Sequence, residues 1–216
     1  KKIYSYLRDN ITCTNFNRFT TDENLKTILK NKNGSVAEIN LLLTAMLKHI
    51  DIDADPVILS TRGHGYTFPL YPLPDQYNYV ITQVDIGNKV YYLDATEPQM
   101  GFGHLPLRCY NGHARIINKQ APAIDLQSSE VKENQISNIF MRNDEKGKLI
   151  GFVQQMPGYY AASSIREKVK EKGKEQLQKD IIKAFGSEIE IANFKIEAAD
   201  DPEQPLKLNY EFDLNE

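Results

Sequence analysis

The sequence predicts an α+β protein in which a buried helix packs on an antiparallel sheet, followed by a smaller α+β unit. Residues 36–50 carry apolar side chains on every face of a helix, which is typical of a helix buried on most sides. Residues 77–96 contain two β-branched and aromatic runs around Gly and Asn, the pattern of a β-hairpin. After residue 136, further strand patterns flank one helical stretch.

Two shorter helices are expected before the buried one. Residues 2–9 place apolar side chains at helical spacing. The next helix is expected to begin at Thr20, because Thr20 and Glu23 have the spacing of a capping box. Residues 31–34 then end it, since Asn and Gly tolerate the left-handed conformation of a helix C-terminus.

The buried helix begins in the stretch NGSVAEIN, residues 33–40. Ser35 and Glu38 repeat the capping-box spacing, so the helix is expected to run from Val36 to Ile50. The cap commits the Ser35 hydroxyl to the backbone N–H of Glu38, which favours a structural role over that of a nucleophile.

A strand at residues 57–61 precedes a loop rich in Pro and Gly, RGHGYTFPLYPLPDQ. Long ordered loops of this kind are often functional. Arg62 and His64 lie at its mouth, where they line a cleft or are simply exposed polar residues. The hairpin that follows, with its turn near Ile86 and Gly87, places Tyr79 opposite Asp94 to within about two residues of register.

The second unit is expected to begin near residue 122, which divides the chain into residues 1–121 and 122–216. Residues 121–135 are polar, lack periodicity and read as a linker. Beyond them the order is ββαββ, with a helix over residues 159–185 broken at Gly173. The predicted strands cover residues 136–142, 148–155, 188–198 and 206–213.

Composition and charge exclude several classes of protein. A formal net charge of -3 gives no electrostatic reason to expect nucleic acid or an anionic membrane as partner. The longest apolar run, residues 39–47, is far below the roughly 20 residues of a transmembrane helix. The chain opens with neither Met nor an apolar signal region, which we interpret as a processed product or fragment of a longer parent protein.

Cys13 and Cys109 are the only cysteines, which excludes a disulfide framework and a four-cysteine zinc site. One disulfide is possible, but two free structural thiols are favoured because a domain of this length needs no covalent link.

Three motifs carry a resemblance to a known family. GSVAE (Gly34 to Glu38) opens the buried helix, YNYV (Tyr77 to Val80) opens the hairpin and YLDATEP (Tyr92 to Pro98) ends it. With these motifs, residues 1–118 resemble the transglutaminase-like core, a branch of the papain-like cysteine enzyme fold.

In that family, a Gly-x-Cys-x-[Asp/Glu] stretch carries the nucleophile, a histidine follows on a strand and LDAT carries the aspartate. The resemblance places Val36 at the cysteine, Tyr79 at the histidine and Asp94 at the aspartate. Valine has neither a lone pair nor an acidic proton, and a tyrosine with a pKa of about 10 is a poor base at neutral pH.

We therefore expect a catalytically inactive protein without cofactor or metal, in which Tyr79 donates a hydrogen bond to Asp94. The old cleft would then serve as a binding or scaffolding site for an unknown peptide, protein or glycan. The candidate cleft residues are Ser35, Glu38, Arg62, His64 and Asn78.

Two alternatives remain open. A cysteine-dependent amidase, peptidase or transglutaminase with a relocated nucleophile would use Cys109, or Ser35, within about 4 Å of an imidazole such as that of His104 or His113. Metal binding by Cys109 and these two histidines is disfavoured, because their spacing fits no compact site. A spacer between domains would instead have a filled groove above Val36.

Residues 122–216 resemble the uncharacterised domain that follows transglutaminase-like cores in some cell-envelope proteins of Gram-negative bacteria. This resemblance implies a periplasmic or secreted protein, with other domains of a longer parent chain among its partners.

Overall fold

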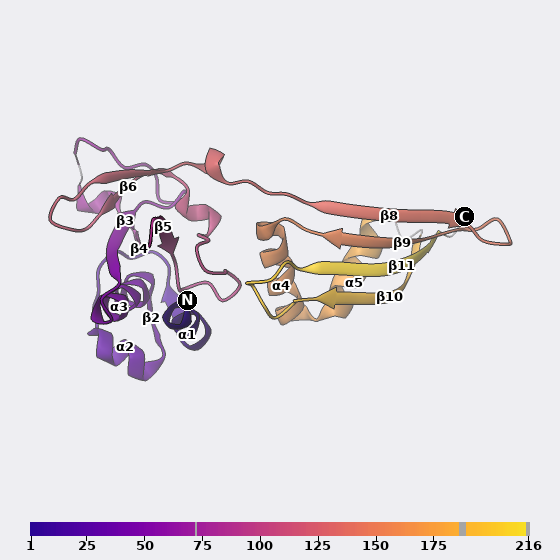
Figure 1. Ribbon diagram of the computed structural model, residues 1–216, viewed down its shortest axis with the longest axis horizontal. Coiled ribbons are helices and arrows are strands. Elements are labelled where there is room, and N and C mark those ends of the chain that lie inside the picture. The colour runs from indigo at the N-terminus through magenta and orange to yellow at the C-terminus, as the bar shows by residue number, and fades with distance from the viewer. Residues whose placement is uncertain (72, 186–188, 215–216) are drawn as a thin grey trace. The chain divides into compact units, whose positions relative to one another are not determined.

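The structure is a computed structural model that describes residues 1–71, 73–185 and 189–214. Packing divides the chain into two units, Lys1–Val131 and Lys132–Glu216 (Figure 1). Each unit is α+β, as the sequence predicts. Among the described residues, no helix combines the length and apolar character needed to cross a membrane.

Unit 1 is built on an antiparallel sheet whose strand order is β5-β4-β3-β6-β7. Its strands are β3 (Asp53–Leu59), β4 (Tyr79–Ile86), β5 (Lys89–Leu93), β6 (Gly112–Ile116) and β7 (Ala123–Leu126). Its helices are α1 (Lys2–Asn10), α2 (Leu25–Asn31) and α3 (Val36–His49). The described residues of this unit also form the short 3₁₀ helices η1 (Pro74–Gln76), η2 (Leu107–Cys109) and η3 (Ser128–Glu130).

Helix α3 is the buried helix and packs against β3 and β4. The predicted capping box is present: the Ser35 hydroxyl accepts from the Glu38 N–H, and the Glu38 carboxylate accepts from the Ser35 N–H. The start of α3 is held further by β2 (Asn33–Ser35), which pairs in parallel with β1 (Thr12–Asn15). The sequence therefore correctly predicts a buried helix on an antiparallel sheet.

The predicted start of α2 at Thr20 is wrong. The helix begins at Leu25, and the side chain of Asn24 caps it by accepting from the Thr27 N–H at 3.0 Å. The reason lies outside the helix: the backbone N–H groups of Asp22 and Glu23 donate to the Glu38 carboxylate, each at 3.0 Å. These hydrogen bonds hold residues 22 and 23 to the first turn of α3, so α2 begins only after them.

Helix α2 ends at Asn31, within the predicted range of residues 31–34, but the residue that caps it differs from the prediction. Lys32, not an Asn or Gly, takes the left-handed conformation with φ 59°. Asn33 and Gly34 are instead extended in β2, where Gly34 approaches the Ile28 side chain so closely that a Cβ would lie 3.0 Å from it.

The boundary between the units lies after Val131 rather than after residue 121. The segment predicted as a linker contains β7, which pairs with β6 and adds a fifth strand to the sheet. Leu126 is buried in the same apolar cluster as Ile116, with Ile124 packed against it. Two apolar side chains at alternate positions suffice to fix this short strand within an otherwise polar segment.

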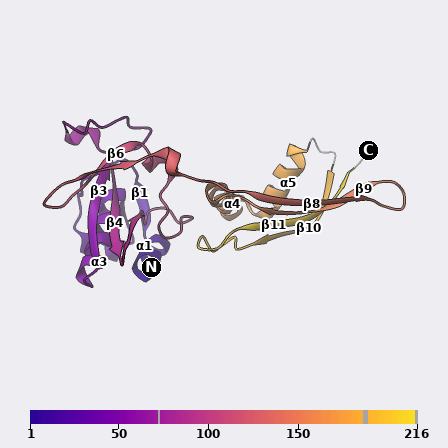
Figure 2. The same ribbon diagram turned by 45° about the horizontal axis from the view of Figure 1, so that its top comes forward.

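Unit 2 has the predicted ββαββ order, with the helical stretch broken at Gly173. Its antiparallel sheet has the order β10-β11-β9-β8. Helices α4 and α5 lie on one face of this sheet (Figure 2). The elements are β8 (Ile136–Asn143), β9 (Leu149–Met156), α4 (Tyr159–Lys172), α5 (Lys174–Ala184), β10 (Ile189–Glu197) and β11 (Lys207–Leu214). Residue 188, the predicted start of β10, lies outside the described residues.

Candidate functional site

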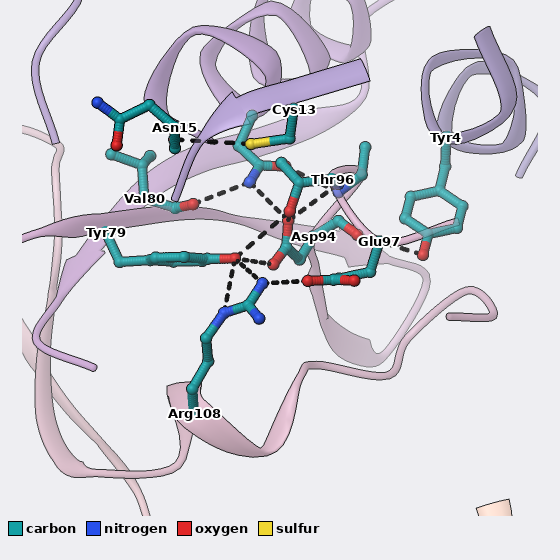
Figure 3. A network of polar contacts seen from close by, with 11 residues as sticks. Tyr4, Cys13, Asn15, Tyr79, Val80, Asp94, Thr96, Glu97 and Arg108 are labelled. Carbon is teal, nitrogen blue, oxygen red and sulfur yellow. Dashed lines mark hydrogen bonds and ion pairs between the residues drawn. The ribbon is translucent and has the colours of Figure 1, made fainter. Parts of the chain in front are cut away.

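The three positions that the sequence analysis singled out converge at the centre of unit 1. Val36 is the first residue of α3, Tyr79 is the first residue of β4 and Asp94 directly follows β5. Each is 0% exposed, and Val36 and Tyr79 share one apolar cluster. The Tyr79 hydroxyl donates to Oδ2 of Asp94 at 2.7 Å, so the predicted hydrogen bond is present (Figure 3).

The Asp94 carboxylate is saturated with hydrogen bonds. Its Oδ1 accepts from Nδ2 of Asn40 at 2.9 Å, from the Thr96 N–H at 3.1 Å and from the Thr96 hydroxyl at 2.6 Å. Asn40 also accepts from the Ala95 N–H and donates to the Val80 carbonyl, both at 2.9 Å. The network therefore ties α3 to both strands of the hairpin.

Sequence reasoning missed the role of Asn40, although a signal for it exists. Asn40 is an amide in an otherwise apolar stretch of helix, four residues after Val36 and hence on the same face. A buried amide requires hydrogen-bond partners, and the unpaired ends of the hairpin supply them.

Arg108, carried by η2, covers the phenol of Tyr79. Its Nη2 and Nε donate to the Tyr79 hydroxyl at 2.8 and 3.3 Å, and it forms an ion pair with Glu97 (Figure 3). Its guanidinium lies 5.2 Å from the ring centroid of Tyr79 and 4.7 Å from that of Phe16. The space next to the Tyr79 hydroxyl is thus occupied by a paired cation, which the sequence did not predict.

Burial and the nearby Asp94 carboxylate raise the pKa of Tyr79 well above its ordinary value. The phenol therefore keeps its proton at neutral pH and donates it to Asp94 as a hydrogen bond.

Three of the five candidate cleft residues are buried and committed to the fold. Ser35 caps α3, as predicted, and its hydroxyl also donates to Oε2 of Glu38 at 3.0 Å. Asn78 accepts from the Thr61 N–H at 2.8 Å and donates to the Thr61 hydroxyl at 2.9 Å. Only Arg62 and His64 are exposed.

The carboxylate of Glu38 anchors the segment that leads into α2. Burial acts to raise its pKa, but hydrogen bonds from the backbone N–H groups of Ser35, Glu23 and Asp22 outweigh this effect, and the net result is a lowered pKa. The acidic residue two positions after Val36 thus acts in the fold as a fixed anion.

The two cysteines are free thiols in environments that oppose ionisation. Cys109 is 1% exposed within the apolar cluster around Val36, and burial, followed by the Asp94 charge, raises its pKa well above the ordinary value. Burial raises the pKa of Cys13 to about 12. A reactive cysteine requires the opposite environment, one that stabilises the thiolate.

The two histidines proposed as partners of Cys109 do not share its buried environment. His104 is exposed, whereas Cys109 is buried. His113 lies on β6, where its Nδ1 is 2.7 Å from the Thr67 hydroxyl. Within the described part of the chain, no group of three or more His, Cys, Asp or Glu residues is arranged to hold a metal ion.

A groove of about 770 Å³ lies elsewhere in unit 1, between the Pro-rich loop and strands β6 and β7. Thr67 fastens the loop by donating to the His113 carbonyl at 3.1 Å, and Arg115 does so by donating to the Pro69 carbonyl at 3.0 Å. Of the predicted cleft residues, Arg62 lines this groove. Among the described residues, the lining is Arg62, Tyr66, Thr67, Pro69, Tyr110, Asn111, Gly112, His113, Ala123, Ile124, Asp125, Gln127 and Ser128.

Comparison with known proteins agrees with the fold of unit 1. Residues 1–95 match the sequence profile of the transglutaminase-like superfamily. No curated protein matches the sequence. Among solved structures, the chain is similar to the crystal structure of a "putative protease" from Parabacteroides distasonis ATCC 8503, with 8% sequence identity and a TM-score of 0.43. That match covers 99% of this chain and 45% of the other, so the chain spans less than half of that protein's length.

Proposed function

We propose that this chain is a catalytically inactive transglutaminase-like module that binds or scaffolds in the bacterial cell envelope. The observation that carries the proposal is the state of the histidine position. Tyr79 there is 0% exposed, donates to Asp94 at 2.7 Å and is covered by Arg108.

Acyl transfer by a cysteine enzyme needs a thiolate, a base within hydrogen-bond reach and room for a substrate carbonyl. At the corresponding positions, the helix begins with an aliphatic Val36 and the phenol keeps its proton. Because Arg108 is paired with Glu97 and stacked on Tyr79, admitting a substrate would require breaking an ion pair and a cation–π contact. These features support a structural use of the old triad.

A relocated nucleophile has little physical support. Cys109 lies in the apolar cluster beside Asp94, whose charge opposes formation of a thiolate. The hydroxyl of Ser35 is engaged with Glu38 at both its donor and acceptor sides. The location in the cell envelope is supported by the resemblance of residues 122–216 to a domain found in such proteins.

The test is a search for acyl-transfer activity that depends on these side chains. The purified chain would be incubated with a glutamine-containing protein and a fluorescent primary amine, and separately with peptide amides. We expect no turnover above that of a matched Cys109→Ala variant. A thiol-reactive probe that both labels the native protein and abolishes a measured turnover would refute the proposal, and Cys13→Ala serves as the control for non-specific labelling.

A further inference from the structure

We propose that the groove between the Pro-rich loop and strands β6 and β7 binds an uncharged saccharide. This inference rests on the proposed function, because it names the ligand class that such a binding module would take. The groove lies entirely within unit 1, and its volume of about 770 Å³ falls in the range of small-ligand sites, roughly 300–1,000 Å³.

The groove is built on the outer face of the sheet. Side chains alternate between the two faces of a strand, and Ala114 and Leu126 are buried on the core side of β6 and β7. His113 and Asp125 are opposite each other in the register of these strands and belong to the outer face. Because Thr67 and Arg115 fasten the loop to β6, the wall facing this floor is fixed.

The lining offers hydrogen-bond donors and acceptors side by side. The Nε of Arg62 donates to the Tyr110 carbonyl at 3.1 Å, which orients an exposed guanidinium. Oδ2 of Asp125 accepts from Nε2 of Gln127 at 2.7 Å, which orients a carboxylate and an amide together. Each sugar hydroxyl both donates and accepts, so a row of planar guanidinium, carboxylate and amide groups suits it.

An aromatic ring completes the set. Tyr66 lines the groove and is 79% exposed, so its face is available for stacking. The face of a sugar ring that carries C–H groups is apolar, and it packs against aromatic rings at little cost in conformational entropy. A lining that combines one exposed ring with oriented polar groups therefore complements both the apolar face and the hydroxyl groups of a saccharide.

The charges of the lining indicate a neutral ligand. Arg62 and Asp125 contribute one positive and one negative charge. Burial and the nearby Arg115 lower the pKa of His113, which keeps its imidazole uncharged at neutral pH. The charges of the side chains that line the groove thus cancel, and Arg115, a further cation beside His113, already donates to the Ala121 and Pro69 carbonyls. The groove therefore has little electrostatic preference for phosphate, acidic sugars or a strongly charged peptide.

The experiment uses the full chain and a matched pair of tyrosines on the same loop. The wild type would be screened on an array of neutral and acidic oligosaccharides, and the dissociation constant for the strongest neutral ligand measured by calorimetry. We expect Tyr66→Ala and Asp125→Ala each to raise it by about tenfold or more. Tyr71→Ala removes a ring that is 73% exposed but does not line the groove, and should leave it unchanged.

Three results would overturn the inference: retention of no neutral oligosaccharide, equal effects of Tyr66→Ala and Tyr71→Ala, or groove-dependent capture of peptides from a displayed peptide library instead of saccharides. Thermal melts establish that each variant is folded, which is expected because all three side chains are exposed. Any of these results would leave the proposed lack of catalysis standing, since that is measured by turnover and not by binding.

Discussion

Unit 1 presents two groups of polar side chains on one sheet, and they differ in what they face. Tyr79, Asp94 and Asn40 are 0% exposed and are joined by hydrogen bonds. In the groove, Arg62, Tyr66 and Asp125 are exposed, with groups directed to solvent. The first group therefore acts on the stability of the fold, whereas the second is available to a ligand.

The difference has a simple physical origin. A buried polar group is costly unless it is bonded, so Tyr79 and Asp94 can stay buried only within a network that satisfies their hydrogen bonds. An exposed polar group is solvated by water and needs no protein partner, so it can exchange water for a ligand. Substitutions should separate the two groups by their effect on the free energy of unfolding.

The largest effect is expected for Asp94→Ala. The change leaves the Tyr79 hydroxyl, the Asn40 amide and both donors of Thr96 without their buried acceptor. We expect the free energy of unfolding to fall by about 3–5 kcal/mol. Urea denaturation followed by far-UV circular dichroism measures this loss.

The matched control is Asp85→Ala, an exposed aspartate on β4 of the same hairpin. Its effect should stay within about 0.5 kcal/mol. Equal losses for the two variants would mean that the Asp94 network contributes no more than a surface carboxylate. That result would contradict the stated difference between the buried network and the exposed groove residues.

An intermediate effect is expected at alkaline pH. The pKa of Cys109 lies well above its ordinary value of 9.0, and that of Cys13 is about 12, so both stay protonated in the fold after the unfolded chain begins to ionise. The stability that each contributes is complete below pH 9.0 and is lost as pH rises. The free energy of unfolding should fall by up to about 1.4 kcal/mol per pH unit for each thiol.

Urea denaturation at several values between about pH 8 and pH 9.5, below the range in which tyrosines ionise, gives this slope. In Cys109→Ala, the cavity lowers stability at every pH, but the slope should decrease by one thiol's share. A free energy of unfolding that stays constant over this range would show that the buried thiols ionise as readily in the fold as in the unfolded chain.

The smallest effect is expected in the groove. Tyr66→Ala and Asp125→Ala should each change the free energy of unfolding by less than about 0.5 kcal/mol, because both side chains are exposed. Urea denaturation of these variants beside Asp94→Ala provides the comparison. A loss near that of Asp94→Ala would mean that the groove is part of the core, which would remove it as a site for a ligand.

The sequence predicts the parts of the fold in which local signals and burial agree. The capping box of Ser35 and Glu38, the apolar faces of α3 and the β-branched runs of the hairpin all specify one conformation, and each prediction was correct. The prediction for Thr20 was wrong because Glu38, distant in sequence, accepts hydrogen bonds from backbone N–H groups of the first predicted turn. A local capping pattern cannot indicate a hydrogen-bond acceptor that lies elsewhere in the sequence.

Only the parts of the site that lie in sequence motifs could be predicted. The hairpin predicts the pair Tyr79 and Asp94 only to within two residues, since Thr82 pairs with Leu93 and the same register places Tyr79 level with Thr96. The Tyr79 hydroxyl nevertheless reaches Asp94, whereas Arg108 comes from the 3₁₀ helix η2, which no sequence motif indicated. The groove could not be predicted from the sequence either, because β7 lies in a stretch whose polar composition resembles that of a linker. In both cases, tertiary packing rather than local preference sets the position.

The burial of the two thiols has a consequence for the chemistry of oxidation. Oxidants and disulfides react with the thiolate, and the surroundings of Cys13 and Cys109 hold both sulfurs in the protonated form. Unit 1 can therefore keep two free cysteines through exposure to mild oxidants, because burial and the nearby carboxylates of Asp94 and Glu97 oppose formation of both thiolates.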